Sequence, residues 1–237
     1  MSQLFYQKEC SSTNDEISQV LLYPDSNFIG LYTFNQTKGR GQYGNTWIST
    51  AEQNLAYTIA IKTDTASLTD FMFNYYTAIA VRQYLAILTE KTVKIKWPND
   101  IILNHKKVAG ILIEKRKYNG ENYFLIGIGI NILQEKFDEI SNAGSIFTQT
   151  GERHDLQTFA KGFHEFLIEK FKKPTFEIKV LADFNENLFR KDKISVFEID
   201  GTRQNGIIRK ADENGKIWIE FEDRLQSFYH KEIKLLY

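Results

Sequence analysis

The chain has 237 residues, 42% of them hydrophobic, which is enough to bury a core in one large domain or in one large and one small domain. Thirty basic residues balance thirty acidic ones, so the net charge does not indicate a nucleic acid or a membrane surface as partner. The single cysteine excludes an intrachain disulfide and a cysteine-rich zinc site, and no signal peptide or apolar run of ~20 residues is present, so we expect a cytoplasmic protein.

The first predicted helix follows a short strand-like start. Residues 11–16 precede apolar residues at helical spacing, and Ser12 with Asp15 has the spacing of an N-terminal cap with an acidic residue in the first turn. A helix cap is the simplest interpretation of this segment. A helix N-terminus rich in hydroxyl and amide groups also presents free N–H donors to a small polar ligand.

Residues 36–47, QTKGRGQYGNTW, form the most distinctive stretch of the chain. Three glycines in six residues free the backbone to turn successive N–H groups toward one anion, while Lys38 and Arg40 add positive charge. Trp47 offers an aromatic face. This combination predicts a loop that binds a nucleotide, and a flexible surface turn is the alternative.

Three other glycine-rich nucleotide loops do not fit residues 36–47. A dinucleotide-binding fingerprint needs a helix directly after the loop, but residues 55–61 predict a strand. A Walker loop needs Lys and then Ser or Thr after its second glycine, where this chain has Asn45 and Thr46. A kinase glycine loop needs companion motifs that the chain lacks.

The hydrophobic pattern predicts the remaining elements. Strands are expected at 29–34, 55–61, 93–103 with an interruption, 107–114 and 123–132, and helices at 67–88, 155–171 and 177–190. After Lys191 the pattern changes to short strands with Asp-Gly and Asn-Gly turns, which is typical of a small β-barrel or sandwich. We therefore predict two domains, at 1–188 and 189–237.

One predicted strand is interrupted at 97–100 by the residues WPND. Because proline cannot donate a hydrogen bond to a sheet, this break can present Lys96, Asn99 and Asp100 together. A cation, an amide and a carboxylate at one place indicate chemistry, with a simple polar turn as the alternative. Lys107 begins the next strand, which is apolar on both faces, and from there it can point into a dry region.

Glycines also occur inside two predicted strands. Gly110 would let a ligand approach the backbone closely, and Gly127 and Gly129 leave the centre of the strand at 123–132 without side chains. A flat ligand on the sheet, with Asn131 beside it, would explain this pattern. A bulge or a barrel bend explains it equally well.

Four segments of the chain fit one family pattern. They are residues 12–14 (STN), residues 36–47, residues 96–100 (KWPND) with 107–114 (KVAGILIE), and residues 127–131 (GIGIN). In this order and spacing the chain resembles the biotin protein ligases over essentially its whole length. The resemblance implies an α+β fold with a central mixed β-sheet and helices packed on one side, the class II synthetase-like biotin/lipoate ligase fold, followed by a small C-terminal SH3-like β-barrel.

The resemblance also implies a reaction and its partners. Biotin protein ligases join biotin to ATP as biotinyl-5′-AMP with release of pyrophosphate, assisted by Mg²⁺. They then transfer biotin to one lysine of a biotin carboxyl carrier protein domain of acetyl-CoA carboxylase or a related carboxylase. Members often pair through the sheet, so a homodimer is one expected assembly. Some carry an N-terminal winged helix that represses transcription, but only about ten residues precede Ser12, so we expect a ligase with no DNA partner.

By position in these motifs, the resemblance implies a role for each candidate residue. The biotin-binding residues would be Ser12, Thr13, Asn14, Gln36, Arg40, Gly41, Gln42, Lys107 and Gly110. The residues binding ATP or the adenylate would be Gly39, Arg40, Gly41, Gly44, Trp47, Lys96, Asn99 and Asn131. The catalytic residues would be Lys107, Arg40, Asp100 and Lys96, and no metal ligands are assigned.

Two positions of the glycine loop depart from the family pattern. The residue after Gly41 is usually arginine and is Gln42 here, and the residue after Gly44 is often arginine and is Asn45 here. Both differences remove phosphate-binding charge, for which Lys38 can partly compensate. They bear on how tightly the loop retains the adenylate.

Two rival functions also fit parts of the sequence. A lipoate or octanoate protein ligase shares the fold and the lysine on the sheet, although the QTKGRG and KWPND segments favour biotin. A nucleic-acid-binding protein would rely on the SH3-like tail and on a basic run at Lys106, Lys107, Lys115, Arg116 and Lys117. The balanced charge of the chain argues against it, and a steep loss of affinity with salt would identify it.

Overall fold

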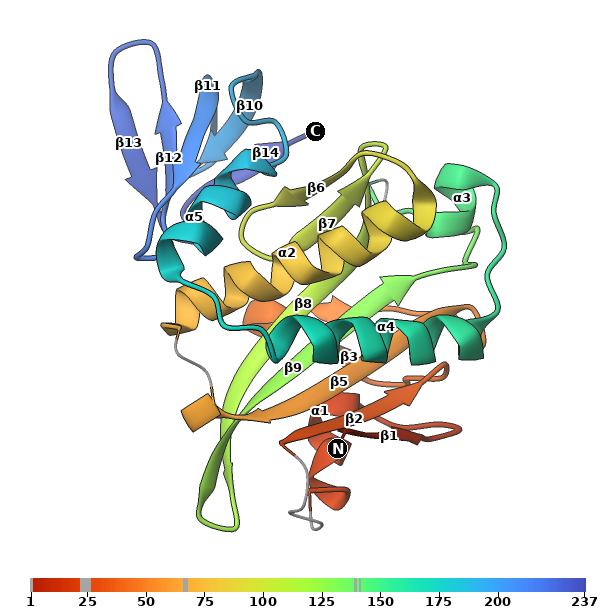
Figure 1. Ribbon diagram of the computed structural model, residues 1–237. Helices are drawn as coiled ribbons and strands as arrows, with labels where there is room; N and C mark the ends of the chain where they lie inside the picture. Colours follow the sequence, from red (N-terminus) through yellow and green to blue (C-terminus); the bar gives the residue numbers. More distant parts are fainter. Residues whose placement is uncertain (1, 22–26, 66–67, 139, 141) are drawn as a thin grey trace.

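The computed structural model describes residues 2–21, 27–65, 68–138, 140 and 142–237. Its centre is a seven-stranded sheet with the order β1-β2-β5-β9-β8-β7-β6 (Figure 1). The strands are β1 (Ser2–Tyr6), β2 (Phe28–Thr33), β5 (Asn54–Lys62), β6 (Val93–Lys96), β7 (Asp100–Leu103), β8 (Lys106–Tyr118) and β9 (Glu121–Asn131). β1 and β2 run parallel and the other neighbours run antiparallel, so the predicted mixed sheet is confirmed.

One face of the sheet is covered by long helices (Figure 1). The helices on this side are α2 (Asp70–Thr89), α4 (Leu156–Phe171) and α5 (Glu177–Glu186), of which α5 packs on α2. Met72, Tyr75, Ile79 and Leu85 are buried along α2, where Tyr75 stacks on Phe184 of α5 with ring centroids 3.8 Å apart. α4 begins at the cap residue Asp155, whose carboxylate accepts a hydrogen bond from the backbone N–H of Thr158.

The opposite face carries a short helical segment. This segment consists of α1 (Thr13–Glu16) and the 3₁₀ turn η1 (Ile17–Gln19), which contact β5, β9 and β2. Ile17 and Leu21 pack there with Ile29, Leu31 and Leu125 in a small apolar cluster. Since this cluster buries the apolar residues that follow α1, the polar N-terminal end of α1 is held beside the strands.

The C-terminal region forms a five-stranded antiparallel sheet. Its order is β13-β12-β11-β10-β14, and its strands are β10 (Ile194–Ile199), β11 (Thr202–Ala211), β12 (Ile217–Glu220), β13 (Leu225–Phe228) and β14 (Lys234–Leu236). The predicted small β region is therefore present, while its SH3-like barrel form remains a prediction. The domain boundary at 188 and 189 also remains a prediction, and one cluster of buried apolar residues runs continuously from the central sheet into this region.

The predicted helix at 177–190 ends early, at Glu186. The next residues bind β6 instead: Ile95 N–H donates to the Asn187 carbonyl at 2.8 Å, and Phe189 N–H donates to the Ile95 carbonyl at 2.7 Å. A partner distant in the sequence therefore ends this helix.

Other element bounds also differ from the prediction. The strand predicted at 107–114 continues to Tyr118, because β8 pairs with β9 along this length through a turn at Asn119 and Gly120 with positive φ. The five-residue helix α3 (Ile146–Thr150) was not predicted, since one turn is too short for a periodic signal. Ser67, the first residue of the helix predicted at 67–88, lies outside the described residues. In the described part of the chain, no helix has the length and apolarity needed to span a membrane.

A buried histidine in α4 makes stability depend on pH. His164 is 4% exposed, its Nδ1 lies 2.8 Å from the hydroxyl oxygen of Tyr57, and burial lowers the pKa of its imidazole from 6.5 to about 4. Below pH 6.5 the unfolded chain therefore binds a proton that the folded chain does not. We expect the free energy of unfolding to fall as pH drops from 6.5 to 4, by up to about 3 kcal/mol from this residue.

Urea unfolding of the wild type and of His164→Gln at several pH values between 7 and 4 checks this expectation. The variant lacks the titrating group, so its stability should fall less over this interval. His105→Gln, at an exposed turn before β8, serves as the control and should follow the wild type. Equal slopes in all three proteins would contradict the prediction.

Candidate active site

One cleft collects most of the candidate residues. It lies between the N-terminal end of α1, the glycine loop, the break between β6 and β7, and the strands β8 and β9. The candidate residues in its lining are Ser12, Thr13, Asn14, Gln36, Arg40, Gly41, Gln42, Trp47, Lys96, Asn99, Asp100, Lys107 and Gly110.

A neutral polar pocket forms one end of the cleft. Ser12 occupies the cap position of α1, but its side chain makes no capping hydrogen bond. Instead the side-chain oxygen of Gln36 accepts a hydrogen bond from Thr13 N–H at 2.9 Å. Asn14 donates through Nδ2 to Glu114 at 2.8 Å. Residues 12–14 are 3–4% exposed, so these bonds hold a preformed set of hydroxyl and amide groups in place.

Thr58 on β5 is a supporting residue that sequence reasoning missed. It is fully buried, and its hydroxyl lies 2.8 Å from the hydroxyl of Thr13 and 2.6 Å from Oδ1 of Asn14. One signal was present: a threonine within the otherwise apolar segment 55–61 is a buried polar group that needs a partner.

The glycine loop folds into a small hairpin. β3 (Gly39–Arg40) pairs with β4 (Thr46–Trp47), and the 3₁₀ turn η2 (Gln42–Gly44) joins them. Gly41 N–H donates to the Asn45 carbonyl at 2.7 Å, and Asn45 N–H donates to the Gln42 carbonyl at 3.2 Å. These two N–H groups are bonded within the hairpin, so only part of the N–H groups expected to bind an anion is free to do so.

Trp47 lies against the glycines of the sheet. A Cβ atom on Gly129 would overlap the indole ring, and one on Gly110 would lie 3.2 Å from Cζ3 of the same ring. The flat group expected on these strands is therefore supplied by the chain itself. The ammonium of Lys107 lies 5.7 Å from the centroid of the indole, within cation–π range.

Asp100 joins two lysines at the opposite end of the cleft. Its Oδ1 lies 2.6 Å from Nζ of Lys107, and its Oδ2 lies 3.5 Å from Nζ of Lys96. Two cations around one carboxylate leave a net charge of one positive unit, which suits an anionic ligand. Asn99, also in the lining, donates through Nδ2 to the carbonyl of Ile111 at 2.6 Å and so fixes the break to β8.

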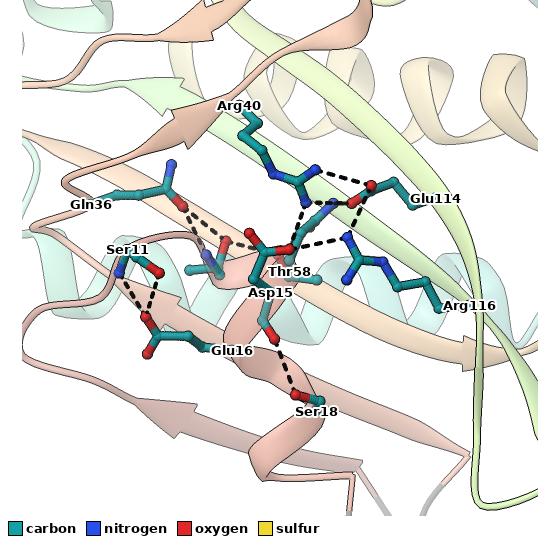
Figure 2. A network of polar contacts seen from close by, with 11 residues as sticks. Ser11, Asp15, Glu16, Ser18, Gln36, Arg40, Thr58, Glu114 and Arg116 are labelled. Atoms are coloured by element: carbon teal, nitrogen blue, oxygen red, sulfur yellow. Dashed lines mark hydrogen bonds and ion pairs between the residues drawn. The ribbon is translucent and has the colours of Figure 1, made fainter. Parts of the chain in front are cut away.

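Arg40 is held by carboxylates of the chain. Its Nη2 donates to Asp15 at 2.8 Å and to Glu114 at 2.9 Å, and Figure 2 shows the guanidinium between these two acids. The sequence indicated a ligand carboxyl or phosphate as its partner. A ligand anion would therefore have to replace existing ion pairs.

His230 is a second residue that sequence reasoning missed. It follows β13 and lines the cleft, where its ring packs edge-on against Trp97 at 5.7 Å and lies 5.0 Å from the ring of Tyr43. Burial lowers the pKa of His230, although Asp100 acts in the opposite direction. Lys231 donates to the carbonyl of Tyr43 at 3.1 Å, so the C-terminal sheet holds the glycine loop. No local motif surrounds this histidine.

Three candidate residues lie outside the lining. Gly39 is buried, and a side chain there would overlap the carbonyl of Trp47, so it is required by the hairpin. Gly44 is exposed at the turn, with φ of +80°. Asn131 donates through Nδ2 to the carbonyl of Gly144 at 2.9 Å and thereby fixes the chain after β9. These contacts explain their presence, and their roles in binding a nucleotide remain predictions.

Comparison with known proteins assigns the family. The profile of the "Biotin/lipoate A/B protein ligase family" matches residues 11–131, which hold every candidate residue named above. The chain belongs to this family. The resemblance inferred from the STN, QTKGRG, KWPND and GIGIN segments is thereby confirmed.

Individual members of the biotin/lipoate ligase family extend the match. The chain is 25% identical to the bifunctional ligase/repressor BirA of Bacillus spizizenii, over 98% of this chain and 74% of that protein. It is 29% identical to BirA of Escherichia coli, over 84% of this chain and 64% of that protein. It thus spans about two thirds of the length of such relatives. The fold matches the biotin protein ligase from Aquifex aeolicus in complex with biotin and ATP, with a TM-score of 0.80, 23% identity, and 99% and 98% of the two chains covered.

The contact between Trp47 and Gly129 leads to a prediction. Gly129→Ala should push the indole off the sheet, because the added methyl group would overlap the ring. We expect a loss of roughly 1–3 kcal/mol in the free energy of unfolding and a shift of the tryptophan fluorescence to longer wavelength.

Gly162→Ala, inside α4, is the matched control. Its nearest neighbour would be the hydroxyl oxygen of Tyr84 at 3.4 Å, so the same substitution should raise stability by up to roughly 1 kcal/mol through helix propensity. An unchanged emission spectrum in Gly129→Ala would refute the packing described here.

Proposed function

We propose that the protein is an ATP-dependent ligase that forms biotinyl-5′-AMP and transfers the biotinyl group to a lysine of a biotin carboxyl carrier protein. The observation that carries this proposal is the composition of one cleft. A neutral pocket at residues 12–14 and Gln36 adjoins a cationic end at Lys96 and Lys107. Biotin has the matching form, with a neutral ureido head and a carboxylate tail.

In the first step the biotin carboxylate attacks the α-phosphate of ATP, an acyl–phosphate bond forms, and pyrophosphate leaves. This step brings two anions together. At about 4 Å and an effective dielectric constant near 20, one pair of unit charges interacts with about 4 kcal/mol. Lys107 and Arg40 would offset this repulsion by placing positive charge beside both anions.

In the second step the acceptor lysine attacks the carbonyl carbon of the adenylate, an amide bond forms, and AMP leaves. The attacking amine must be neutral, whereas a free lysine has a pKa near ~10.4. We propose that Asp100 accepts the proton or orients the amine. Its place in the cleft supports this role, since it is the carboxylate in the described lining.

The side chains of the cleft do not fit a magnesium ion held by the protein alone. The lining offers one carboxylate, Asp100, and both of its oxygens are bonded to lysines. Among the described residues, no group of three His, Cys, Asp or Glu side chains could hold a metal ion. Mg²⁺ in nucleotide sites is bound largely by phosphates and water. We propose that Mg²⁺ would enter with ATP and supply positive charge at its phosphates, while the roles of the side chains in the two steps stay as described.

The partner that we propose is the carrier domain of acetyl-CoA carboxylase or a related carboxylase, in the cytoplasm. Two of the relatives are named bifunctional ligase/repressor, but the family match and the cleft concern the ligase part, so we propose ligase activity alone. A homodimer is proposed with it.

A lipoate or octanoate ligase is the alternative within the same family. The ureido group of biotin has two N–H donors and one carbonyl acceptor, for which Ser12, Thr13 and Asn14 offer hydroxyl and amide partners. The dithiolane ring of lipoate and the alkyl chain of octanoate have no such groups. Burying these polar side chains against an apolar acid would leave them without partners, which favours biotin.

Pyrophosphate release on mixing the protein with ATP, Mg²⁺ and biotin tests the first step. We expect biotin-dependent release and none with lipoate. Lys107→Ala should lower kcat/KM for this release by roughly 100-fold or more, as for the loss of one charge-stabilising group in an active site.

Lys106→Ala provides the matched control, since Lys106 neighbours Lys107 in β8 but is absent from the described cleft lining, and its kcat/KM should stay close to that of the wild type. Release with lipoate in place of biotin would assign the alternative function. No release with either acid would overturn the proposal.

Asp100→Asn separates the two steps. If Asp100 serves the acceptor amine, the variant should slow transfer to a purified carrier domain by ~100-fold or more, the scale of general base catalysis. Pyrophosphate release should change much less, because both lysines remain. Single-turnover measurements of adenylate formation and of transfer give the two rates. A larger loss in adenylate formation would assign Asp100 to the first step instead.

A further inference from the structure

Asp15 and Glu114 each bind two arginines. Asp15 Oδ1 accepts from Arg40 at 2.8 Å and from Arg116 at 3.0 Å. Glu114 accepts from Arg40 at 2.9 and 3.3 Å and from Arg116 at 3.1 Å. Figure 2 shows the four side chains converging, with Arg40 and Arg116 on different sides of the acid pair. The cluster contains two positive and two negative charges and is neutral.

Three elements bring this cluster to the edge of the cleft. Glu114 and Arg116 are two residues apart on β8, so they lie on the same face of the strand as the cleft residues Gly110 and Leu112. Asp15 comes from α1, and Arg40 comes from the glycine hairpin. Within the described structure, Arg40 lines the cleft, whereas Arg116 is absent from its lining.

Glu114 also connects the cluster to the neutral pocket. Its Oε2 accepts from Asn14 at 2.8 Å as well as from Arg40. Burial raises the pKa of Glu114, but the hydrogen bonds from Asn14 and Arg116 outweigh it, so the net pKa lies below its ordinary value and the carboxylate is charged at neutral pH. Asn14 and Arg40 are thereby held by one charged group.

The second arginine determines what happens when Arg40 turns to a ligand. If Arg40 alone served both acids, its departure would leave two neighbouring carboxylates without a counter-charge. Because Arg116 bonds to both acids, they stay paired when Arg40 leaves. Arg40 and Asp15 are 39% and 43% exposed, so water can replace the broken bonds and the exchange is cheap.

We propose that Arg116 is a positioning residue that keeps Asp15 and Glu114 neutralised and so releases Arg40 to bind the ligand anion in the cleft. The ligand chemistry is a carboxylate that becomes an acyl phosphate, and this assignment rests on the proposed function. Arg40 alternates between the acid pair and the ligand, while Arg116 stays with the acid pair.

Two substitutions with opposite expected effects test this proposal. Arg116→Gln leaves Arg40 as the single counter-charge of both acids, so Arg40 should bind them more tightly. The KM for biotin in pyrophosphate release should then rise by about 2- to 5-fold, which corresponds to one part-exposed ion pair. Asp15→Asn removes one acid from Arg40 and should lower the same KM by a similar factor. The double variant should return toward the wild type, and the differences should shrink at high salt.

Arg209→Gln is the matched control. Arg209 on β11 also bridges two acids, Asp192 and Glu220, and is 40% exposed, but it lies in the C-terminal sheet and is not among the cleft-lining residues of the described structure. It should leave the KM for biotin unchanged. If Arg116→Gln and Asp15→Asn both raise the KM, the cluster is only structural and the proposal is overturned.

A measurement without ligand separates this proposal from the proposed function. Amide hydrogen exchange at residues 38–46 should slow in Arg116→Gln and accelerate in Asp15→Asn. The reason is that the ion pairs between Arg40 and the two acids restrain the glycine hairpin. These changes need no turnover. If amide hydrogen exchange changes as expected but the wild type releases no pyrophosphate, the proposed function fails, while the proposed change of partner by Arg40 stands. Equal amide hydrogen exchange in all variants would overturn the proposal about Arg116.

Discussion

Close approach to the central strand at Gly127 and Gly129 is the constraint on which the cleft depends. Asn14 lies against the first of these glycines and Trp47 against the second, and a Cβ atom at either position would overlap them. The polar end of α1 and the glycine hairpin can therefore both rest directly on β9. From the adjacent strand β5, Thr58 then reaches Asn14 with a hydrogen bond. Because Gly127 and Gly129 have no side chains, segments from distant parts of the sequence can meet on one surface.

Elements with a strong local signal could be predicted from the sequence, whereas bounds set by distant partners could not. The apolar residues of segments 29–34 and 55–61 predicted β2 and β5 to within one residue at each end. The helix expected at 177–190 stops at Glu186 because residues 187–189 bond to β6, almost a hundred residues earlier in the chain. Local propensity cannot predict a hydrogen-bond partner so distant in the sequence.

The same division applies to the site. The motifs that resemble the biotin protein ligases implied that Ser12, Arg40 and Lys107 bind one ligand, and all three line one cleft. They could not show that Arg40 binds Glu114, 74 positions away, since many carboxylates were available as partners. His230 comes from a turn with no motif, and only the docking of the C-terminal sheet brings it near the glycine loop. The glycines of β9 were recognised, but the sequence could not show that Asn14 packs on Gly127 and Trp47 on Gly129.

The cations of the cleft are already paired with carboxylates of the chain, which bears on selectivity. Asp100 pairs with both lysines, and Arg40 pairs with acids outside the lining. An anion entering the cleft therefore competes with these acids and meets a net charge of only one positive unit at Lys96, Lys107 and Asp100, so simple phosphate or a short carboxylate gains little from charge alone. A ligand that also fills the neutral pocket gains the hydrogen bonds of residues 12–14 in addition. Under the proposed function, this pairing within the chain would make tight binding depend on both ends of the ligand and so favour an acid with a polar head over other anions.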